Sequence, residues 1–314
     1  MLTFLTRSFR WLIESYLFIV VAAIAVGIFF SEPVSHLAPY TTLFLQVIFF
    51  LSSLKLETKE VVRGVKQWKT LVVTNAIILL ILPTVVFLLT RGMDAETGFA
   101  LTLLAAMPAG MTLPLMADVI GADRPLALLL TVSTSLLAPL TIPLILSALV
   151  GSEIELPFLS MVWRLFLVIV IPFACAQVVR RILKVGVANN AYLFKPVSLL
   201  LLGGLIAASV ATNAPAISGS LPRLASALFL LVLFFLGIHL FAHLCFFWKP
   251  YKEQVTIAAS VTFMNFTLAI YLANQYFPDP DIIILLVLSI IPWAILLVPL
   301  ASLTEHLRKR GWVR

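Results

Sequence analysis

The sequence MPAGMTLP, residues 107–114, lies in the middle of an apolar segment that extends from about residue 98 to residue 120. Its two prolines and one glycine interrupt a continuous helix, because each proline lacks a backbone donor and crowds the preceding turn. In a bilayer, a broken helix is tolerated only where the freed backbone groups contact protein or line a cavity. Secondary transporters place such breaks at their binding sites near the membrane midplane. The stretch therefore predicts a carrier and locates its candidate site.

The composition places the whole chain in a membrane. Of its 314 residues, 62% are hydrophobic and 11% are charged, whereas a soluble domain has about 45–50% apolar and about 25% charged residues. We expect one transmembrane unit over residues 1–314, without room for a soluble domain. The formal net charge of +7 predicts contact with membrane lipid rather than with nucleic acid.

Ten apolar segments are long enough to cross a bilayer as helices. They extend over about 11–30, 38–54, 70–90, 98–120, 126–150, 158–180, 192–212, 223–247, 253–276 and 281–303. We therefore predict an all-α membrane protein with ten transmembrane helices.

The loop charges agree with this count. With the N-terminus in the cytoplasm, the inner segments hold most of the basic residues, including the run from Lys55 to Lys69 and the tail at 308–314. The outer segments are acidic, as at Asp94 and Glu96. This asymmetry follows the positive-inside rule and predicts a multi-pass protein of the plasma (inner) membrane with both termini cytoplasmic.

Ten spans divide into two halves of five, about 1–151 and 152–314, and an odd number of spans makes the second half inverted in the membrane. The broken fourth span then corresponds to the ninth, where residues 260–267 form a polar insertion among apolar residues. Matching interruptions in two halves are the best sequence indication of a transporter's site.

Several motifs resemble those of the bile acid:sodium symporter family. The resemblance rests on Pro108-Ala109-Gly110, on 131–134 followed by Ala138-Pro139-Leu140, on 51–56, and on Met264-Asn265 through Leu268-Ala269. It implies a fold of two inverted five-helix repeats, with a panel domain from spans 1, 2, 6 and 7 and a core domain from the others. It also implies that broken helices 4 and 9 cross within the core, and that an organic anion binds between the two domains.

The sequence departs from that family at most of its sodium-ligand positions. In place of the family's residues stand Leu113-Pro114, Ser260, Met264, Ile78 (with Asn75 one turn away) and the neighbourhood of Ala127 and Thr131. Because hard cations are held by oxygen ligands, these replacements remove most of the side-chain oxygen. We expect no cofactor; a sodium ion is the only candidate ion, and these replacements argue against it.

The candidate residues for binding substrate or ion form the breaks or are polar residues near them. They are Asn75, Pro108, Gly110, Thr112, Thr131, Ser133, Thr134, Ser260, Thr262, Asn265 and Thr267. Hydroxyls in membrane helices also commonly bond their own helix at i−4, and Asn265 could instead serve helix packing. The helix N-termini at the breaks present N–H groups and a positive dipole end, which suit an anion.

His239 and His243 lie four residues apart, on one helix face. Two histidines without further placed ligands do not predict a metal site. His239 is a candidate for proton coupling, because ionisable residues inside membrane spans commonly mark functional sites and histidine titrates near neutrality. The alternative is a packing hydrogen bond.

The sequence thus predicts a secondary transporter of a small organic anion that works by alternating access, and not an enzyme, since the spans hold no nucleophile–base set. One alternative is a sodium-independent carrier, either proton-coupled or a uniporter. Another is a membrane sensor that has lost transport. The related arsenite-efflux permeases are disfavoured, because no cysteine lies near Pro108. The sequence names neither the anion nor the oligomeric state.

Overall fold

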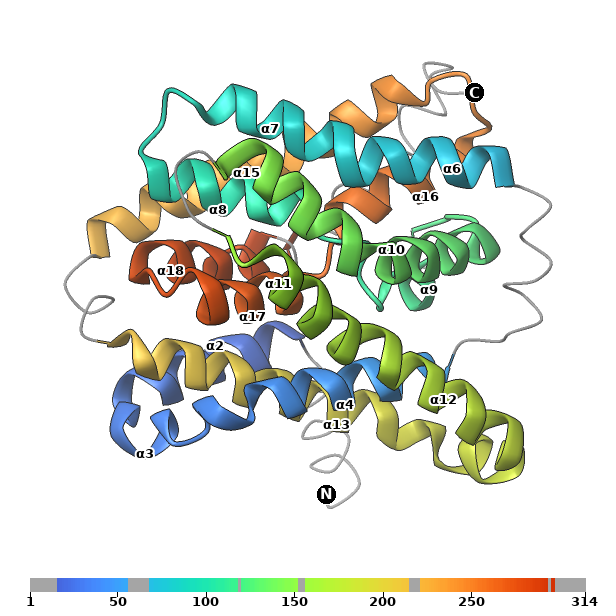
Figure 1. The fold of residues 1–314 in the computed structure, drawn as a ribbon, viewed down its shortest axis with the longest axis horizontal. Helices are drawn as coiled ribbons and strands as arrows, with labels where there is room; N and C mark the ends of the chain where they lie inside the picture. The colour runs from blue at the N-terminus through green and yellow to red at the C-terminus, as the bar shows by residue number, and fades with distance from the viewer. Residues whose placement is uncertain are drawn as a thin grey trace, which may run out of the picture.

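A computed structural model describes residues 16–55, 68–117, 120–151, 156–214, 221–292 and 295–296. Every regular element among these residues is a helix, and the helices are stacked in layers (Figure 1). The prediction of an all-α fold is therefore confirmed for the described part of the chain. The basic residues at 56–67 and both termini, on which the predicted orientation depends, lie outside it.

The first half contains α2 (Tyr16–Phe29), α3 (Ser31–Ser35), η1 (Ala38–Tyr40), α4 (Thr41–Ser53), α6 (Trp68–Ala76), η3 (Ile77–Ile81), α7 (Leu82–Thr90), α8 (Ala95–Ala105), α9 (Leu113–Met116) and α10 (Arg124–Val150). The second half contains α11 (Phe158–Leu165), η4 (Phe166–Val170), α12 (Ile171–Ile182), α13 (Lys184–Thr212), α15 (Leu221–Cys245), α16 (Tyr251–Thr262), α17 (Phe266–Tyr276) and α18 (Pro280–Leu288).

Six helical segments among the described residues are long and apolar enough to cross a membrane by themselves. They are Ser31–Ser53, Trp68–Thr90, Arg124–Val150, Phe158–Ile182, Val185–Thr212 and Leu224–Cys245. Phe18–Phe29, Ala95–Ala105 and Pro280–Pro292 are apolar but shorter. The predicted break in the fourth segment is confirmed, because α8 ends at Ala105 and α9 begins at Leu113. The ninth segment is likewise divided, between α16 and α17.

Prolines shape two of the long helices. Pro83 and Pro172 each stand two residues after a π-helical turn, η3 and η4 respectively. A proline removes one i→i−4 hydrogen bond and its ring pushes against the preceding turn, and a widened turn relieves that clash. The helices therefore continue past both prolines.

One group of helices consists of α2, α4, α12 and α13, which pack against one another and lie together at the bottom of Figure 1. The close contact of α2 with α13 depends on Gly27. A Cβ at this position would lie 2.7 Å from the Ala207 carbonyl oxygen and 2.8 Å from the Val210 Cβ. Only a residue without a side chain permits this approach.

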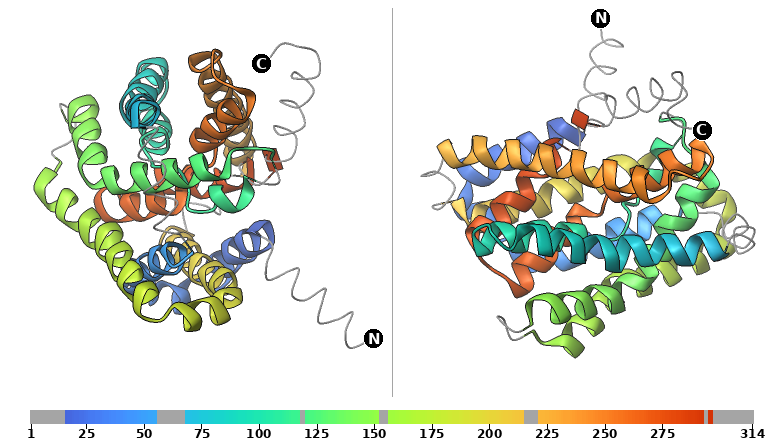
Figure 2. Two further views of the ribbon diagram at one scale, coloured as in Figure 1. Left: turned by 90° about the vertical axis from the view of Figure 1, so that its right-hand side faces the viewer. Right: turned by 90° about the horizontal axis from the view of Figure 1, so that it is seen from above.

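The second group holds α6, α7, α8, α10, α15 and α16, and the left view of Figure 2 shows its helices apart from α2, α4 and α13. Helices α17 and α18 lie between the two groups in Figure 1. Helix α17 contacts α4 and α13 on one side and α18 and α8 on the other. Its residues from Phe266 to Ala273 are all buried, so α17 occupies the core of the molecule.

We predict that Gly27→Ala loosens the packing of α2 on α13 and destabilises the protein by about 1–3 kcal/mol, because overpacking forces backbone shifts. The measurement is thermal unfolding of the purified protein in detergent. Gly237→Ala is the control: a Cβ there meets nothing within 4 Å, and alanine in a helix is more stable than glycine by about 0.5–1 kcal/mol. Equal melting temperatures for the two variants would contradict the close contact.

Candidate functional site

The two helix breaks contact each other directly through their backbones. The Gly110 N–H donates to the Phe263 carbonyl at 2.6 Å, and the Asn265 N–H donates to the Pro108 carbonyl at 2.8 Å. Together these bonds make an isolated antiparallel bridge between Ala109 and Met264. Each broken helix thus satisfies polar groups that the other has freed, as an apolar environment requires.

Glycine is required at position 110, because the crossing leaves no room for a Cβ. A Cβ there would lie 2.6 Å from the Phe263 carbonyl oxygen and 3.3 Å from that of Met264. Both obstacles are backbone atoms, which cannot rotate away as a side chain can. The glycine therefore sets how closely the two breaks approach.

Helix α10 fastens the first break with two buried hydroxyls. Thr134 Oγ1 accepts from the Ala109 N–H at 3.1 Å and donates to the Leu130 carbonyl at 2.6 Å. Thr131 Oγ1 donates to the Gly110 carbonyl at 3.4 Å. These two predicted site residues hold the crossing, and neither is among those that line the groove beside it.

Asn265 begins helix α17. Its Oδ1 accepts from the Leu268 N–H at 3.1 Å, which makes it the N-cap of the helix. Asparagine is a favoured residue at this position because its side chain satisfies a free N–H of the first turn. Its Nδ2 has no hydrogen-bond partner among the described residues, and Asn265 also lines the neighbouring groove.

A small groove separates the crossing from helices α4 and α13, with a volume of about 70 Å³. Its walls are Leu45, Ile48, Phe49 and Ser52 from α4, Ser198, Leu199 and Leu202 from α13, Gly110, Met111 and Thr112 from the first break, and Met264, Asn265, Phe266 and Thr267 from the second. None of these lining residues is charged.

The polar side chains of the groove have unused hydrogen-bonding capacity. Ser198 Oγ is buried and has no partner. The hydroxyls of Ser52, Thr112 and Thr267 make no hydrogen bond to another described residue. An apolar groove with a few convergent polar groups is the usual form of a small-molecule site, so this groove is the candidate site.

The structure brings only part of the predicted set to the groove: Gly110, Thr112, Asn265 and Thr267. Pro108 acts at the crossing through its carbonyl. The other predicted residues lie elsewhere: Ser133 donates to Asn75 Oδ1 at 3.1 Å, Ser260 donates to the Ile257 carbonyl of its own helix, and Thr262 donates to the Ala258 carbonyl.

Sequence reasoning missed Ser52 and Ser198 as lining residues. Ser52 belongs to the stretch 51–56, which resembles the family's motif, and Ser198 is a lone hydroxyl in the long helix α13. Their common feature is a polar side chain in an apolar span. That feature could have identified both serines as candidates, but nothing in the sequence places them opposite the breaks.

His239 contacts the end of helix α16. Its Nδ1 lies 2.8 Å from Thr262 Oγ1, and that hydroxyl already donates its hydrogen to Ala258. Thr262 must therefore accept, which assigns the hydrogen of a neutral His239 to Nδ1. The buried Nε2 has no partner. The ring of His243 packs edge-on at 4.9 Å between centroids.

The crossing is a poor fit for a sodium ion. The carbonyls of Pro108, Gly110 and Phe263 accept hydrogen bonds from the N–H groups of Asn265, Leu113 and Gly110 respectively. No carboxylate lines the groove, although oxygen ligands are what such an ion needs. Among the described residues, no group of three or more His, Cys, Asp or Glu could hold a metal.

Comparison with known proteins matches residues 14–309 to the model of the SBF-like CPA transporter family (DUF4137). The chain is 25% identical over 266 residues to the uncharacterized sodium-dependent transporter YocS of Bacillus subtilis, which covers 82% of this chain and 81% of that protein. It is 28% identical over 145 residues to sodium/bile acid cotransporter 7 of Danio rerio, or 44% of this chain and 43% of the relative. With sodium/bile acid cotransporter 7-A of Xenopus laevis it shares 25% identity over 185 residues, 56% of this chain and 53% of the relative.

We predict that Thr134→Val destabilises the protein by about 1–3 kcal/mol, because it leaves the buried Ala109 N–H without an acceptor. Thr141→Val is the matched control on the same helix, since that hydroxyl bonds only the Leu137 carbonyl of α10 itself. Thermal unfolding in detergent measures both. A Thr134→Val variant as stable as Thr141→Val would show that α10 does not fasten the break.

Proposed function

The chain belongs to the SBF-like CPA transporter family, and we propose that it carries a small organic anion across the membrane by alternating access. Membership confirms the resemblance to bile acid:sodium symporters that the sequence motifs predicted. Beyond family membership, we propose a substrate class, a transport mechanism and the residues that bind the substrate.

The observation that carries the proposal is the convergence of unused donors on one uncharged groove. Ser52 and Ser198 face it from α4 and α13, and Thr112, Asn265 and Thr267 face it from the two breaks. A bound substrate would give these groups the partners that they lack in the closed groove. Leaving buried polar groups unsatisfied costs free energy, so the arrangement favours an occupant with several acceptor atoms.

An anion suits this groove better than a cation. Thr267 lies in the first turn of α17, whose N-terminal end faces the groove through Asn265, Phe266 and Thr267. The N-terminus of a helix carries a partial positive charge and favours negative groups. A carboxylate could accept from the Asn265 amide and the hydroxyls without a charged side chain.

Alternating access needs two bodies that move against each other. We propose that the group containing α2, α4, α12 and α13 is the panel domain and that the crossing belongs to the core domain of a ten-span inverted repeat. The position of the groove between them supports this assignment. In the present closed state its volume of about 70 Å³ is below the range of about 300–1,000 Å³ that is typical of ligand sites, so loading requires the two bodies to separate.

We propose that transport does not depend on sodium at the crossing. The hydrogen bonds to the break carbonyls and the absence of a carboxylate in the groove support this. Relatives of this chain are named as a sodium-dependent transporter and a sodium/bile acid cotransporter. The hydrogen-bonded carbonyls and the uncharged groove are the physical reasons for which we propose that this chain differs from them.

Proton coupling through His239 is the second candidate mechanism. The unpartnered Nε2 of His239 can take a proton, and its Nδ1 contacts Thr262, the residue before the second break. Protonation would place a charge beside the crossing, and a buried charge favours a state that admits water. The remaining alternative, a sensor without transport, would bind the anion without moving it.

The first test uses the purified protein in liposomes with labelled taurocholate, acetate, pyruvate and succinate as separate probes. For the probe that is taken up, we expect Ser198→Ala to raise KM by roughly 2–10-fold, the loss of one hydrogen bond. Thr141→Val, whose side chain lies outside the groove, should leave KM unchanged. Uptake of a probe with no effect of Ser198→Ala would reject this groove. If a probe raises the melting temperature of the protein but no probe is taken up, the protein is better explained as a membrane sensor without transport.

The second test varies the ions. We expect uptake to be the same in sodium and in choline, and to rise as the outside pH falls if His239 binds the coupled proton. His239→Gln should then remove the pH dependence. His36→Gln, at an exposed turn after α3, should retain it. A sodium requirement would reject the first part of the proposal, and pH-dependent uptake by His239→Gln would reject the second.

A further inference from the structure

A much larger groove lies away from the crossing, with a volume of about 770 Å³. It is bounded by the α7–α8 loop and the first turn of α8, by the first turns of α15, and by the start of α18. It shares no lining residue with the small groove at the crossing. Nothing in the proposed transport mechanism uses it.

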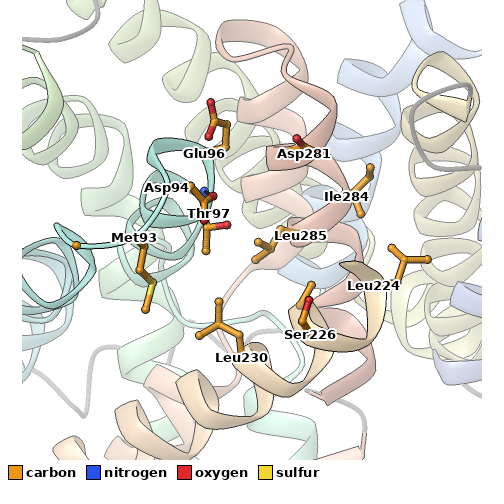
Figure 3. Close-up of a pocket in the computed structure, with 12 residues that line it drawn as sticks. Met93, Asp94, Glu96, Thr97, Leu224, Ser226, Leu230, Asp281, Ile284 and Leu285 are labelled. Atoms are coloured by element: carbon orange, nitrogen blue, oxygen red, sulfur yellow. Dashed lines mark hydrogen bonds between the residues drawn. The ribbon is translucent and has the colours of Figure 1, made fainter. Parts of the chain in front are cut away.

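The two ends of this groove differ in character (Figure 3). Glu96 and Asp281 lie at one end of the view, and Met93 and Leu230 lie at the other. Leu224, Ala227, Ile284 and Leu285 continue the apolar wall, and no lysine, arginine or histidine is among the described lining residues. The groove therefore suits an amphiphile with a positive group at one end.

Positions at helix N-termini explain only in part why carboxylates line this groove. Asp94 is the N-cap of α8, where its Oδ2 accepts from the Thr97 N–H at 3.0 Å. Hydrogen bonds from the Thr97 side chain, and to a lesser extent from the backbone, lower the pKa of Asp94. Glu96 and Asp281 stand in the first turns of α8 and α18, which favour negative charge. Their carboxylates, however, make no hydrogen bond or ion pair with another described residue.

The adjoining groove offers the opposite charge. It has a volume of about 440 Å³, shares Met93 and Asp94 with the first, and contains Arg91. The Arg91 guanidinium lies 5.1 Å from the centre of the Phe87 ring and contacts no carboxylate among the described residues. One loop thus presents acidic groups on one side and a guanidinium on the other, which together complement a zwitterion.

We propose that the larger groove binds a membrane phospholipid with a primary ammonium headgroup. Its ammonium would donate to Glu96 and Asp281, its phosphate would extend toward Arg91 in the adjoining groove, and an acyl chain would lie along Leu224, Leu230 and Leu285. Carboxylate–ammonium hydrogen bonds need N–H donors, so the groove selects a primary ammonium over the quaternary ammonium of phosphatidylcholine, which has none.

A lipid fits the groove better than a soluble ligand or a metal ion. The wall of α15 belongs to a helix that is apolar and long enough to span the membrane, so acyl chains are the available apolar partner. The three carboxylates do not form a group that could hold a metal, within the described residues. The volume of about 770 Å³ lies in the range of about 300–1,000 Å³ that is typical of small-molecule sites, which suits the headgroup and part of an acyl chain.

The test is native mass spectrometry of the delipidated, detergent-purified protein with phosphatidylethanolamine, its monomethyl and dimethyl derivatives, phosphatidylcholine and phosphatidylglycerol, all with the same acyl chains. We expect affinity to fall with each methyl group and to differ about tenfold between the first and the fourth of these lipids, the effect of losing charge-assisted hydrogen bonds. Equal binding across the series, or tighter binding of phosphatidylglycerol, would overturn the proposal. This series needs no variant protein.

Substitutions of residues that line the larger groove test whether the lipid binds there. The double substitution Glu96→Gln/Asp281→Asn should abolish the preference for phosphatidylethanolamine while leaving the binding of phosphatidylcholine unchanged, and Ala227→Trp should weaken all five lipids by filling the groove. Glu32→Gln, an exposed carboxylate in the first turn of α3, is the matched control and should keep the preference. A preference that survives the double substitution would place the lipid elsewhere and overturn the proposal. None of these outcomes depends on uptake of an anion, so failure of the transport proposal would be seen separately.

Discussion

The structure depends on the pairing of two helix breaks through their own backbones. The bonds between Gly110 and Phe263 and between Pro108 and Asn265 let two interrupted helices cross inside an apolar protein without leaving these groups unsatisfied. Because Gly110 leaves no room for a Cβ, the approach is close enough for both bonds. The groove, the start of α17 and the position of α10 are all defined relative to this pair.

The same pairing has a chemical consequence for ion binding. Backbone oxygens that accept hydrogen bonds from the opposite break are less available to a cation, and the threonines of α10 use their hydroxyls to hold the first break. One relative of this chain is named as a sodium-dependent transporter. In this chain, the carbonyls of Pro108, Gly110 and Phe263 accept hydrogen bonds within the protein, which is the physical basis of the sodium independence that we propose.

The two grooves differ in construction, and we propose a different ligand for each. The small groove at the crossing is uncharged and lies between two helix groups, so its size depends on their relative position. The larger groove is built from the ends of α8, α15 and α18 and combines carboxylates with apolar walls. Packed helices connect the two grooves: α8, α17 and α18 contact one another, and α15 contacts α16, which ends at the second break.

The membrane class, the helical content and the position of both breaks could be predicted from the sequence, because hydrophobic composition and the Pro/Gly pattern are local properties. It also indicated the family through motifs that follow the chain in order. Which polar residues meet depends on how the helices pack in three dimensions. Ser52 and Ser198 come from helices that the sequence does not relate to residues 108–112 and 264–267, whereas Asn75 and Ser133 pair with each other instead. A hydroxyl in a span can bond its own helix or face a groove, and packing between helices distant in sequence decides which.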